Sequence, residues 1–186
     1  MGNRGVLHDP SGRIVRDCHV RRWIACRLEF RGRKRAIMQP GRYTELFFLD
    51  EATALAAGHR PCAECRHADF VTFMAAWRRA HAHAAAASVD EVDRQLHAER
   101  RDGPWRQRTH AADLAAVPDG AFIARDGHAW LVLGKRLLRW TAGGYIEPAP
   151  RPTDGREVTL LTPPSIVAVL RAGYQPLLHP TASAGA

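Results

Sequence analysis

The stretch "GHRPCAECRH" at residues 58–67 restricts the fold most, because it places Cys62 and Cys65 in a C-x-x-C spacing beside a glycine and a proline. Gly58 can end one helix and Pro61 can begin the next, so both sulfurs would lie between two helices. Backbone N–H groups and the positive end of a helix favour the thiolate, the form of cysteine that binds metal. Thioredoxin-like redox pairs share the spacing, but they follow a strand and an aromatic residue. The stretch therefore predicts one half of a metal site.

The chain has four cysteines, and four is the number of ligands that one tetrahedral zinc ion takes. Cys18 and Cys26 lie in a β-rich stretch at a spacing compatible with a hairpin. The predicted Zn²⁺ ligands are Cys18, Cys26, Cys62 and Cys65. The fourth ligand stays open, and the alternatives to Cys18 are His8, His19, His59 and His67.

The sequence shows no export signal and no membrane span. The start "MGNRGVLHDPSGR" lacks the apolar core of a signal peptide, and no run approaches the roughly 18 apolar residues that a span needs. Cysteines in the reducing cytosol are thiols or metal ligands rather than disulfides. We expect a cytoplasmic protein of 186 residues without a membrane partner, long enough for one domain or two small ones.

Positive charge is concentrated in the first quarter of the chain. Residues 1–45 hold 11 Lys and Arg against 4 Asp and Glu, a net charge of +7, whereas residues 46–186 carry a net charge of +1. A general preference for arginine would explain the residue type but not this placement. An arginine fork suits phosphate oxygens, so the asymmetry predicts contact with nucleic acid, DNA above all. The arginines expected along the phosphates are Arg21, Arg22, Arg27, Arg31, Arg33 and Arg35.

The first half of the chain changes from a β-type to a helical pattern. Residues 12–48 alternate β-branched, aromatic and charged residues, and "RGRK" is typical of a hairpin turn. Asp50 can cap a short helix, a second helix is predicted over residues 61–87, and Ser88 can cap a third. The core-facing stripe of the second helix comprises Phe70, Phe73, Met74 and Trp77.

From residue 117, short apolar runs alternate with "DG", "GK" and "GG" turns, which predicts an antiparallel sheet or barrel. The expected fold class is α+β, with a small zinc-bearing β-hairpin and helix module, further helices, and a C-terminal antiparallel β-rich module. The predicted domains are residues 1–115 and 116–179, followed by a disordered tail over residues 180–186.

The run "LFFLDEATALAAGHRPCAECR" resembles part of the zinc-binding domain at the N-terminus of Ada, the methylation-response DNA-repair protein. In that family an aromatic strand leads into a helix that ends A-x-x-A-G-[FY]-[RK]-P-C-x-x-C. The resemblance covers about residues 25–67. The matching residues are Phe47 or Phe48, Ala54, Ala57, Gly58, Arg60, Pro61, Cys62 and Cys65.

The resemblance implies one zinc bound by four cysteines, basic residues along a DNA backbone, and a thiolate that accepts a methyl group from a DNA phosphotriester. Cys62 and Cys65 would be ligands, and Cys26 or Cys18 would be the acceptor. The family spaces its first pair C-x-x-x-C, whereas seven residues separate Cys18 from Cys26 here. We therefore expect a zinc-binding protein that contacts nucleic acid in DNA repair or its regulation, more a binding protein than an enzyme.

Other function classes remain open. A metal-dependent nuclease is one alternative, although no spacing singles out its catalytic groups; a zinc-braced structural or interaction protein is another. A zinc deaminase needs H-x-E before P-C-x-x-C, and here His97 to Glu99 comes after Cys62. The groups available to a nuclease are His19, His110 with Asp113, and His128 with Asp126.

Tryptophans beside arginines are a further pattern in the chain. Such pairs can stack bases and hold phosphates, although burial is the commoner fate of tryptophan. The tryptophans are Trp23, Trp105, Trp130 and Trp140, and the neighbouring arginines are Arg21, Arg22, Arg106 and Arg139.

Overall fold

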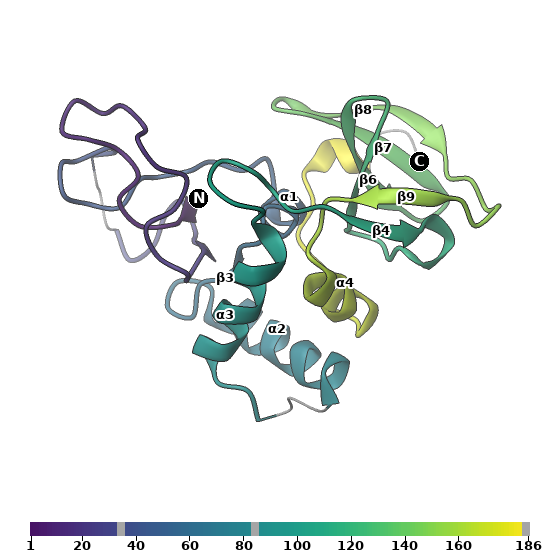
Figure 1. Ribbon diagram of the computed structural model, residues 1–186, viewed down its shortest axis with the longest axis horizontal. Helices are drawn as coiled ribbons and strands as arrows, with labels where there is room; N and C mark the ends of the chain where they lie inside the picture. The colour runs from purple at the N-terminus through teal and green to yellow at the C-terminus, as the bar shows by residue number, and fades with distance from the viewer. Residues whose placement is uncertain (33–35, 83–85, 184–186) are drawn as a thin grey trace.

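The computed structural model describes residues 1–32, 36–82 and 86–183. The predicted α+β class is confirmed: the described residues form four α-helices, a small three-stranded sheet and a six-stranded antiparallel sheet. Figure 1 shows the N-terminal loops on one side of the molecule and the six-stranded sheet on the other. Helices α2, α3 and α4 lie below and between these two parts.

The small sheet joins three two-residue strands from distant parts of the chain. Strand β2 (Ile24–Ala25) lies in the middle, antiparallel to β1 (Gly2–Asn3) and parallel to β3 (Arg60–Pro61). This differs from the expected hairpin within residues 12–48, because β2 finds both partners outside that stretch. Part of the predicted "RGRK" turn lies outside the described residues.

Helix α1 (Glu51–Ala56) begins where the sequence predicts it, because the Asp50 carboxylate accepts a hydrogen bond from Thr53 N at 2.8 Å. The second helix begins later than predicted: α2 spans His67–Ala80. Pro61 belongs instead to β3, since the next backbone N–H, that of Cys62, donates to Ala25 O at 3.0 Å. Turns then occupy the residues between β3 and α2.

Helix α3 (Val89–Arg100) starts at a capping box, in which Ser88 and Glu91 bond each other's backbone and side chain. The six-stranded sheet has the order β4-β9-β5-β6-β7-β8, and α4 (Pro164–Arg171) follows its last strand in the chain. The predicted antiparallel C-terminal module is therefore present. Its strands are β4 (His110–Asp113), β5 (Phe122–Arg125), β6 (His128–Leu133), β7 (Arg136–Thr141), β8 (Gly144–Pro150) and β9 (Glu157–Leu160).

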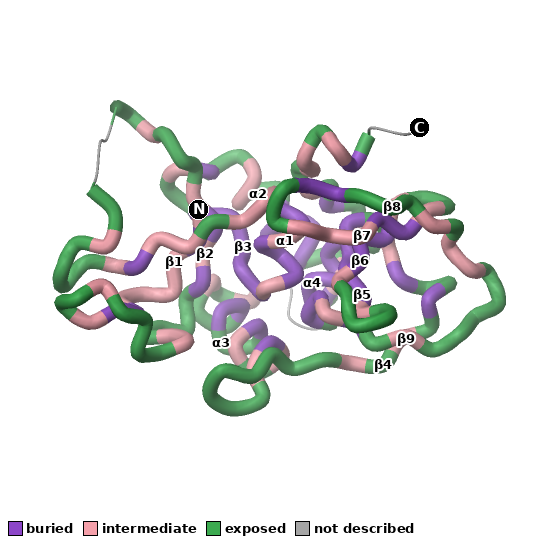
Figure 2. The backbone as a smooth tube through the Cα atoms, turned by 90° about the horizontal axis from the view of Figure 1, so that it is seen from above, coloured by how far each residue is buried: buried purple, intermediate pink, exposed green. Residues whose placement is uncertain are grey.

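The larger hydrophobic core crosses the domain boundary predicted at residue 115. It joins Phe73 and Trp77 of α2 and Leu96 of α3 to Ile123 of β5 and Ile166 of α4. A smaller cluster packs α1 against the other face of the large sheet. Figure 2 shows the buried stretches in the helices and the large sheet, whereas the N-terminal loops are mostly exposed or half-buried.

The first residues of the predicted disordered tail, 180–183, are folded, and the rest of that tail lies outside the described residues. Residues Pro180–Ala182 form a 3-10 turn with Ala182 fully buried, and Tyr145 N donates to Thr181 Oγ1 at 2.8 Å. In the part of the chain that the structure describes, no helix has the length and apolar character needed to cross a membrane.

Gly58 ends α1 in a left-handed conformation, with φ at +78°, and packs against Arg100 of α3. A Cβ at this position would lie 2.4 Å from Arg100 Cδ. We expect Gly58→Ala to lower the free energy of unfolding by about 2–4 kcal/mol, because backbone strain and steric overlap add.

Gly12→Ala is the matched control, because Gly12 has a φ of +84° and an added Cβ would meet nothing within 4 Å. Backbone strain alone should cost about 1 kcal/mol there. Urea unfolding of both variants measures the difference. If the two substitutions lowered the free energy of unfolding equally, steric overlap with Arg100 would not contribute to the cost at Gly58.

Candidate metal centre

Three of the four cysteines meet at the edge of the small sheet. One ligand atom from each of Cys26, Cys62 and Cys65 lies within 4.8 Å of the other two. Among the described residues, no other His, Cys, Asp or Glu joins this group, and no other group of three such side chains has this proximity. The arrangement can hold a metal ion.

The register of the small sheet produces this meeting. Ala25 of β2 is paired in parallel with Pro61 of β3, so the next residue on each strand is a cysteine, Cys26 or Cys62. Cys62 N donates to Ala25 O at 3.0 Å, and Cys26 N donates to the backbone carbonyl of Met1 at 2.6 Å. These bonds fix two cysteines from distant segments side by side.

The turn between β3 and α2 supplies the third sulfur, at Cys65. It is anchored by the next residue, Arg66, whose guanidinium forms ion pairs with Glu51 at 2.9 Å and Asp69 at 2.8 Å. Glu51 also accepts a hydrogen bond from Tyr174 Oη at 2.6 Å. The cysteine turn is thereby tied to α1, to α2 and to the C-terminal part of the chain.

Hydrogen bonds favour a thiolate in this group. The pKa of Cys62 is lowered to about 5, chiefly because the Cys26 thiol donates to its sulfur and also because the backbone N–H groups of Cys65 and Glu64 do so. The same bond raises the pKa of Cys26, since that thiol keeps the shared proton. Arg27 N donates to Cys65 Sγ at 3.3 Å. The donors therefore favour a thiolate at Cys62, whereas burial raises the pKa of Cys65.

Cys18, predicted as a ligand, lies outside the three-cysteine group. Its neighbour Asp17 accepts hydrogen bonds from Arg101 Nη2 at 2.8 Å and from Trp105 N at 3.1 Å. These bonds tie the loop to the C-terminal end of α3. Cys18 is half-buried, and burial raises its pKa.

The histidines considered as alternatives to Cys18 also lie outside the group. His8 contacts Thr44 Oγ1 at 2.6 Å, and His19 accepts a hydrogen bond from Val6 N at 3.3 Å. His59 and His67 are likewise engaged elsewhere: Arg4 Nε donates to His59 Nε2 at 3.3 Å, and His67 Nδ1 lies 3.0 Å from Ala63 O.

A cavity of about 270 Å³ borders all three cysteines of the group. Its apolar wall includes Leu28, Ile37 and Phe47, whose side chains are 72%, 61% and 63% exposed. These residues lie outside the helices and strands, and no periodic pattern in the sequence predicts that they share one cavity wall. The sulfurs can be reached from this cavity.

The predicted phosphate-binding arginines have different positions relative to this centre. Arg27 borders the cavity, directly after Cys26. Arg21, Arg22, Arg27 and Arg31 are exposed, whereas Arg33 and Arg35 lie outside the described residues.

The histidines suggested for a nuclease have other partners. His110 Nε2 lies 3.0 Å from Glu99 O, and His128 Nε2 lies 3.3 Å from Arg139 Nη1. Neither joins a described group of three potential metal ligands.

The assignment of a metal site to the three cysteines depends on this geometry and on the sequence. Searches of protein-family models, of curated proteins and of solved structures found no match to this chain.

Proposed function

We propose that the protein binds one zinc ion through the thiolates of Cys26, Cys62 and Cys65 and contacts nucleic acid through the exposed arginines of its N-terminal part. The observation that carries the proposal is the proximity of the three sulfur ligand atoms, within 4.8 Å of one another. Thiolates are soft ligands, and zinc is the metal that most often takes such sets in a tetrahedral site.

In this proposal the fourth zinc position is taken by solvent or by a ligand that enters from the adjoining cavity. A centre with three protein ligands and one exchangeable position differs from a closed four-cysteine site, which only braces a fold. Bound zinc would keep all three sulfurs as thiolates at neutral pH. The N–H of Arg27, which donates to Cys65 Sγ, would lower the electron density on that sulfur.

The nucleic-acid part of the proposal rests on charge. The net charge of +7 over residues 1–45 is carried mainly by arginine, and Arg21, Arg22, Arg27 and Arg31 are exposed. The sequence resemblance to the Ada zinc-binding domain supports DNA as the polymer and repair as the setting. The proposal does not include methyl transfer, because only the resemblance to the Ada domain suggests that activity.

Binding to a short DNA duplex tests the charge argument. Replacing Arg21, Arg22, Arg27 and Arg31 by alanine should weaken binding at all sequences and make the slope of log K against log salt shallower by about one unit per lost phosphate contact. Fluorescence anisotropy over a range of salt concentrations measures both effects.

The matched control changes the same amount of charge elsewhere, by replacing the exposed Arg78, Arg94, Arg125 and Arg156 with alanine. It should leave the slope nearly unchanged. If both variants lost affinity equally, net charge alone would account for binding, and the N-terminal arginines would have no special role.

A further inference from the structure

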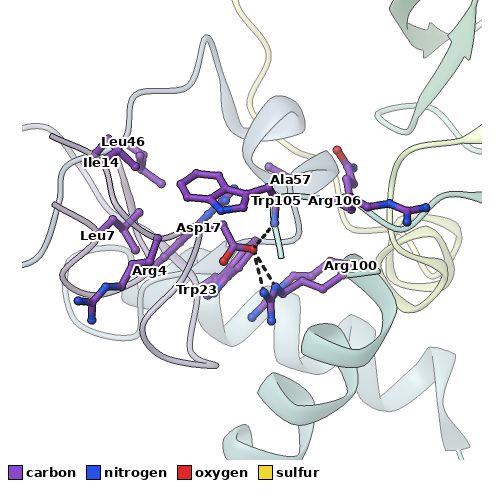
Figure 3. A pocket seen from close by; sticks show the side chains of 13 residues that line it. Arg4, Leu7, Ile14, Asp17, Trp23, Leu46, Ala57, Arg100, Trp105 and Arg106 are labelled. Carbon is purple, nitrogen blue, oxygen red and sulfur yellow. Dashed lines mark hydrogen bonds and ion pairs between the residues drawn. The ribbon is translucent and has the colours of Figure 1, made fainter. Parts of the chain in front are cut away.

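A second cavity, of about 280 Å³, lies between the N-terminal loops and the end of α3. Its walls carry several arginines and two indole rings. Figure 3 shows Trp23, Trp105, Asp17 and Arg100 gathered together, with the apolar side chains of Leu7, Ile14 and Leu46 on the opposite side. The three cysteines of the metal group do not line this cavity.

Trp23 forms the floor and is contacted by two guanidinium groups. The central carbon atoms of Arg4 and Arg100 each lie 3.8 Å from the centroid of the Trp23 ring, which is only 4% exposed. Arg4 comes from the N-terminal segment and Arg100 from the last turn of α3. The guanidinium groups of Arg4 and Arg100, which come from separate elements, therefore both form cation–π contacts with Trp23.

Arg100 is buried without a carboxylate partner among the hydrogen bonds and ion pairs of the described residues. Its side chain is 2% exposed and donates to two backbone carbonyls, those of Gly58 and Arg21. Its Nε is buried and has no hydrogen-bond partner in the described structure. A buried guanidinium usually pairs with an anion, and Arg100 lacks that partner among the described residues.

Arg4 is half-buried, and its hydrogen-bond partner carries no charge. Its Nε donates to His59, a fully buried histidine whose pKa is held well below its usual value by burial and by Arg4 and Arg100. Burial also lowers the pKa of Arg4 to about 10. His59 is therefore neutral and does not offset the charge of Arg4.

The carboxylate that faces the cavity is already engaged. Asp17 accepts bonds from Arg101 Nε at 3.2 Å, from Arg101 Nη2 at 2.8 Å, and from Trp105 N at 3.1 Å. Its negative charge is balanced by Arg101. Three other lining cations, Arg4, Arg16 and Arg100, form no ion pair with any described residue. The cavity is therefore positive.

Trp105 stands at the mouth of the cavity. Its side chain is 62% exposed, and its backbone has a φ of +60°, a left-handed conformation that is unfavourable for a bulky residue. Such strain persists where surrounding bonds impose it, and here Trp105 N is held by Asp17. An exposed indole in a fixed position offers a stacking surface.

We propose that this cavity binds one nucleotide unit, with its phosphate on Arg4 and Arg100 and its base stacked on Trp105. The class of ligand follows from the pairing of a buried and a half-buried guanidinium, those of Arg100 and Arg4, with an exposed indole. Phosphate and a planar base are the groups that these side chains recognise. The source is either a free nucleotide or one unit of a single strand. The inference extends the nucleic-acid part of the proposed function and does not depend on the metal.

Titration with deoxyadenosine monophosphate, followed by tryptophan fluorescence and calorimetry, tests the proposal. We expect saturable binding, with deoxyadenosine and inorganic phosphate each binding at least about tenfold more weakly. Trp105→Ala and Arg4→Gln should each weaken binding by about tenfold or more, and Trp105→Phe should retain most of it because a ring remains for stacking.

Two control variants should bind as the wild type does. Arg13→Gln removes an exposed arginine from the same N-terminal segment, and Leu28→Ala truncates a side chain at the other cavity, beside the cysteines. A short single strand that binds more tightly than the mononucleotide would identify a strand as the source, and equal affinity would identify the free nucleotide.

Two results would overturn the inference: no binding of either probe, or binding that Trp105→Ala and Arg4→Gln leave unchanged. Its failure can be distinguished from that of the proposed function. None of the four arginines replaced in the duplex-binding test lines the nucleotide cavity, so that variant retains every side chain of the cavity wall. That variant should lose duplex binding and keep binding of the mononucleotide.

Discussion

If the three cysteines hold zinc as proposed, its removal by a chelator is expected to release residues 1–32 and 36–48 from the fold while the C-terminal sheet stays protected. No described residue before Leu49 belongs to either hydrophobic cluster, so the N-terminal part has little apolar burial of its own to hold it. The three strands of its sheet have two residues each. When a segment has so little core, the free energy of metal binding becomes free energy of folding.

The effect should be large enough to measure by hydrogen exchange with mass spectrometry. With zinc at about 100 times its Kd, binding contributes about 2.7 kcal/mol, so backbone amides in residues 1–32 and 36–48 should exchange about a hundredfold faster after chelation. Amides of β6 and β7 provide the internal control. Unchanged exchange in the N-terminal residues would show that the metal does not brace this part of the protein.

Asp93→Ala is expected to lower the free energy of unfolding by about 3–5 kcal/mol, because it leaves Arg60 as an unpaired buried charge. Arg60 directly precedes Pro61 and Cys62, and its side chain is 2% exposed. It donates from Nε to Asp93 Oδ1 at 2.9 Å and from Nη2 to Asp93 Oδ2 at 2.8 Å. This bidentate pair joins the cysteine strand to α3.

Asp90→Ala is the matched control for this prediction, since Asp90 lies one turn earlier on α3 and is exposed. Loss of its charge from the first turn of the helix should cost less than about 1 kcal/mol. Urea unfolding of both variants makes the comparison. Similar costs for the two substitutions would mean that Arg60 finds another partner or becomes solvated.

Local patterns in the sequence predicted the features that depend on neighbouring residues. The C-x-x-C spacing identified Cys62 and Cys65, the Asp50 cap placed the start of α1, and the "DG", "GK" and "GG" turns indicated the antiparallel C-terminal sheet. In each case the residues that determine the conformation lie within a few positions of one another.

The features that were wrong or missing depend on contacts between distant segments. The parallel pairing of β2 with β3 joins Ala25 to Pro61, and it leaves no periodic signal because each strand has two residues. Because the same pairing places Pro61 in β3, helix α2 begins at His67 rather than at Pro61. Residue type and a hairpin-compatible spacing from Cys26 predict Cys18 as a ligand, but the bonds of Asp17 to Arg101 and Trp105 hold its loop outside the three-cysteine group.

Zinc content per chain in the wild type and in four single Cys→Ser variants tests the central claim most directly. Elemental analysis of the purified proteins should find about one zinc ion in the wild type and in Cys18→Ser, and a strongly reduced content in Cys26→Ser, Cys62→Ser and Cys65→Ser. Loss of zinc from Cys18→Ser, or full retention in Cys26→Ser, would contradict a centre built from these three cysteines.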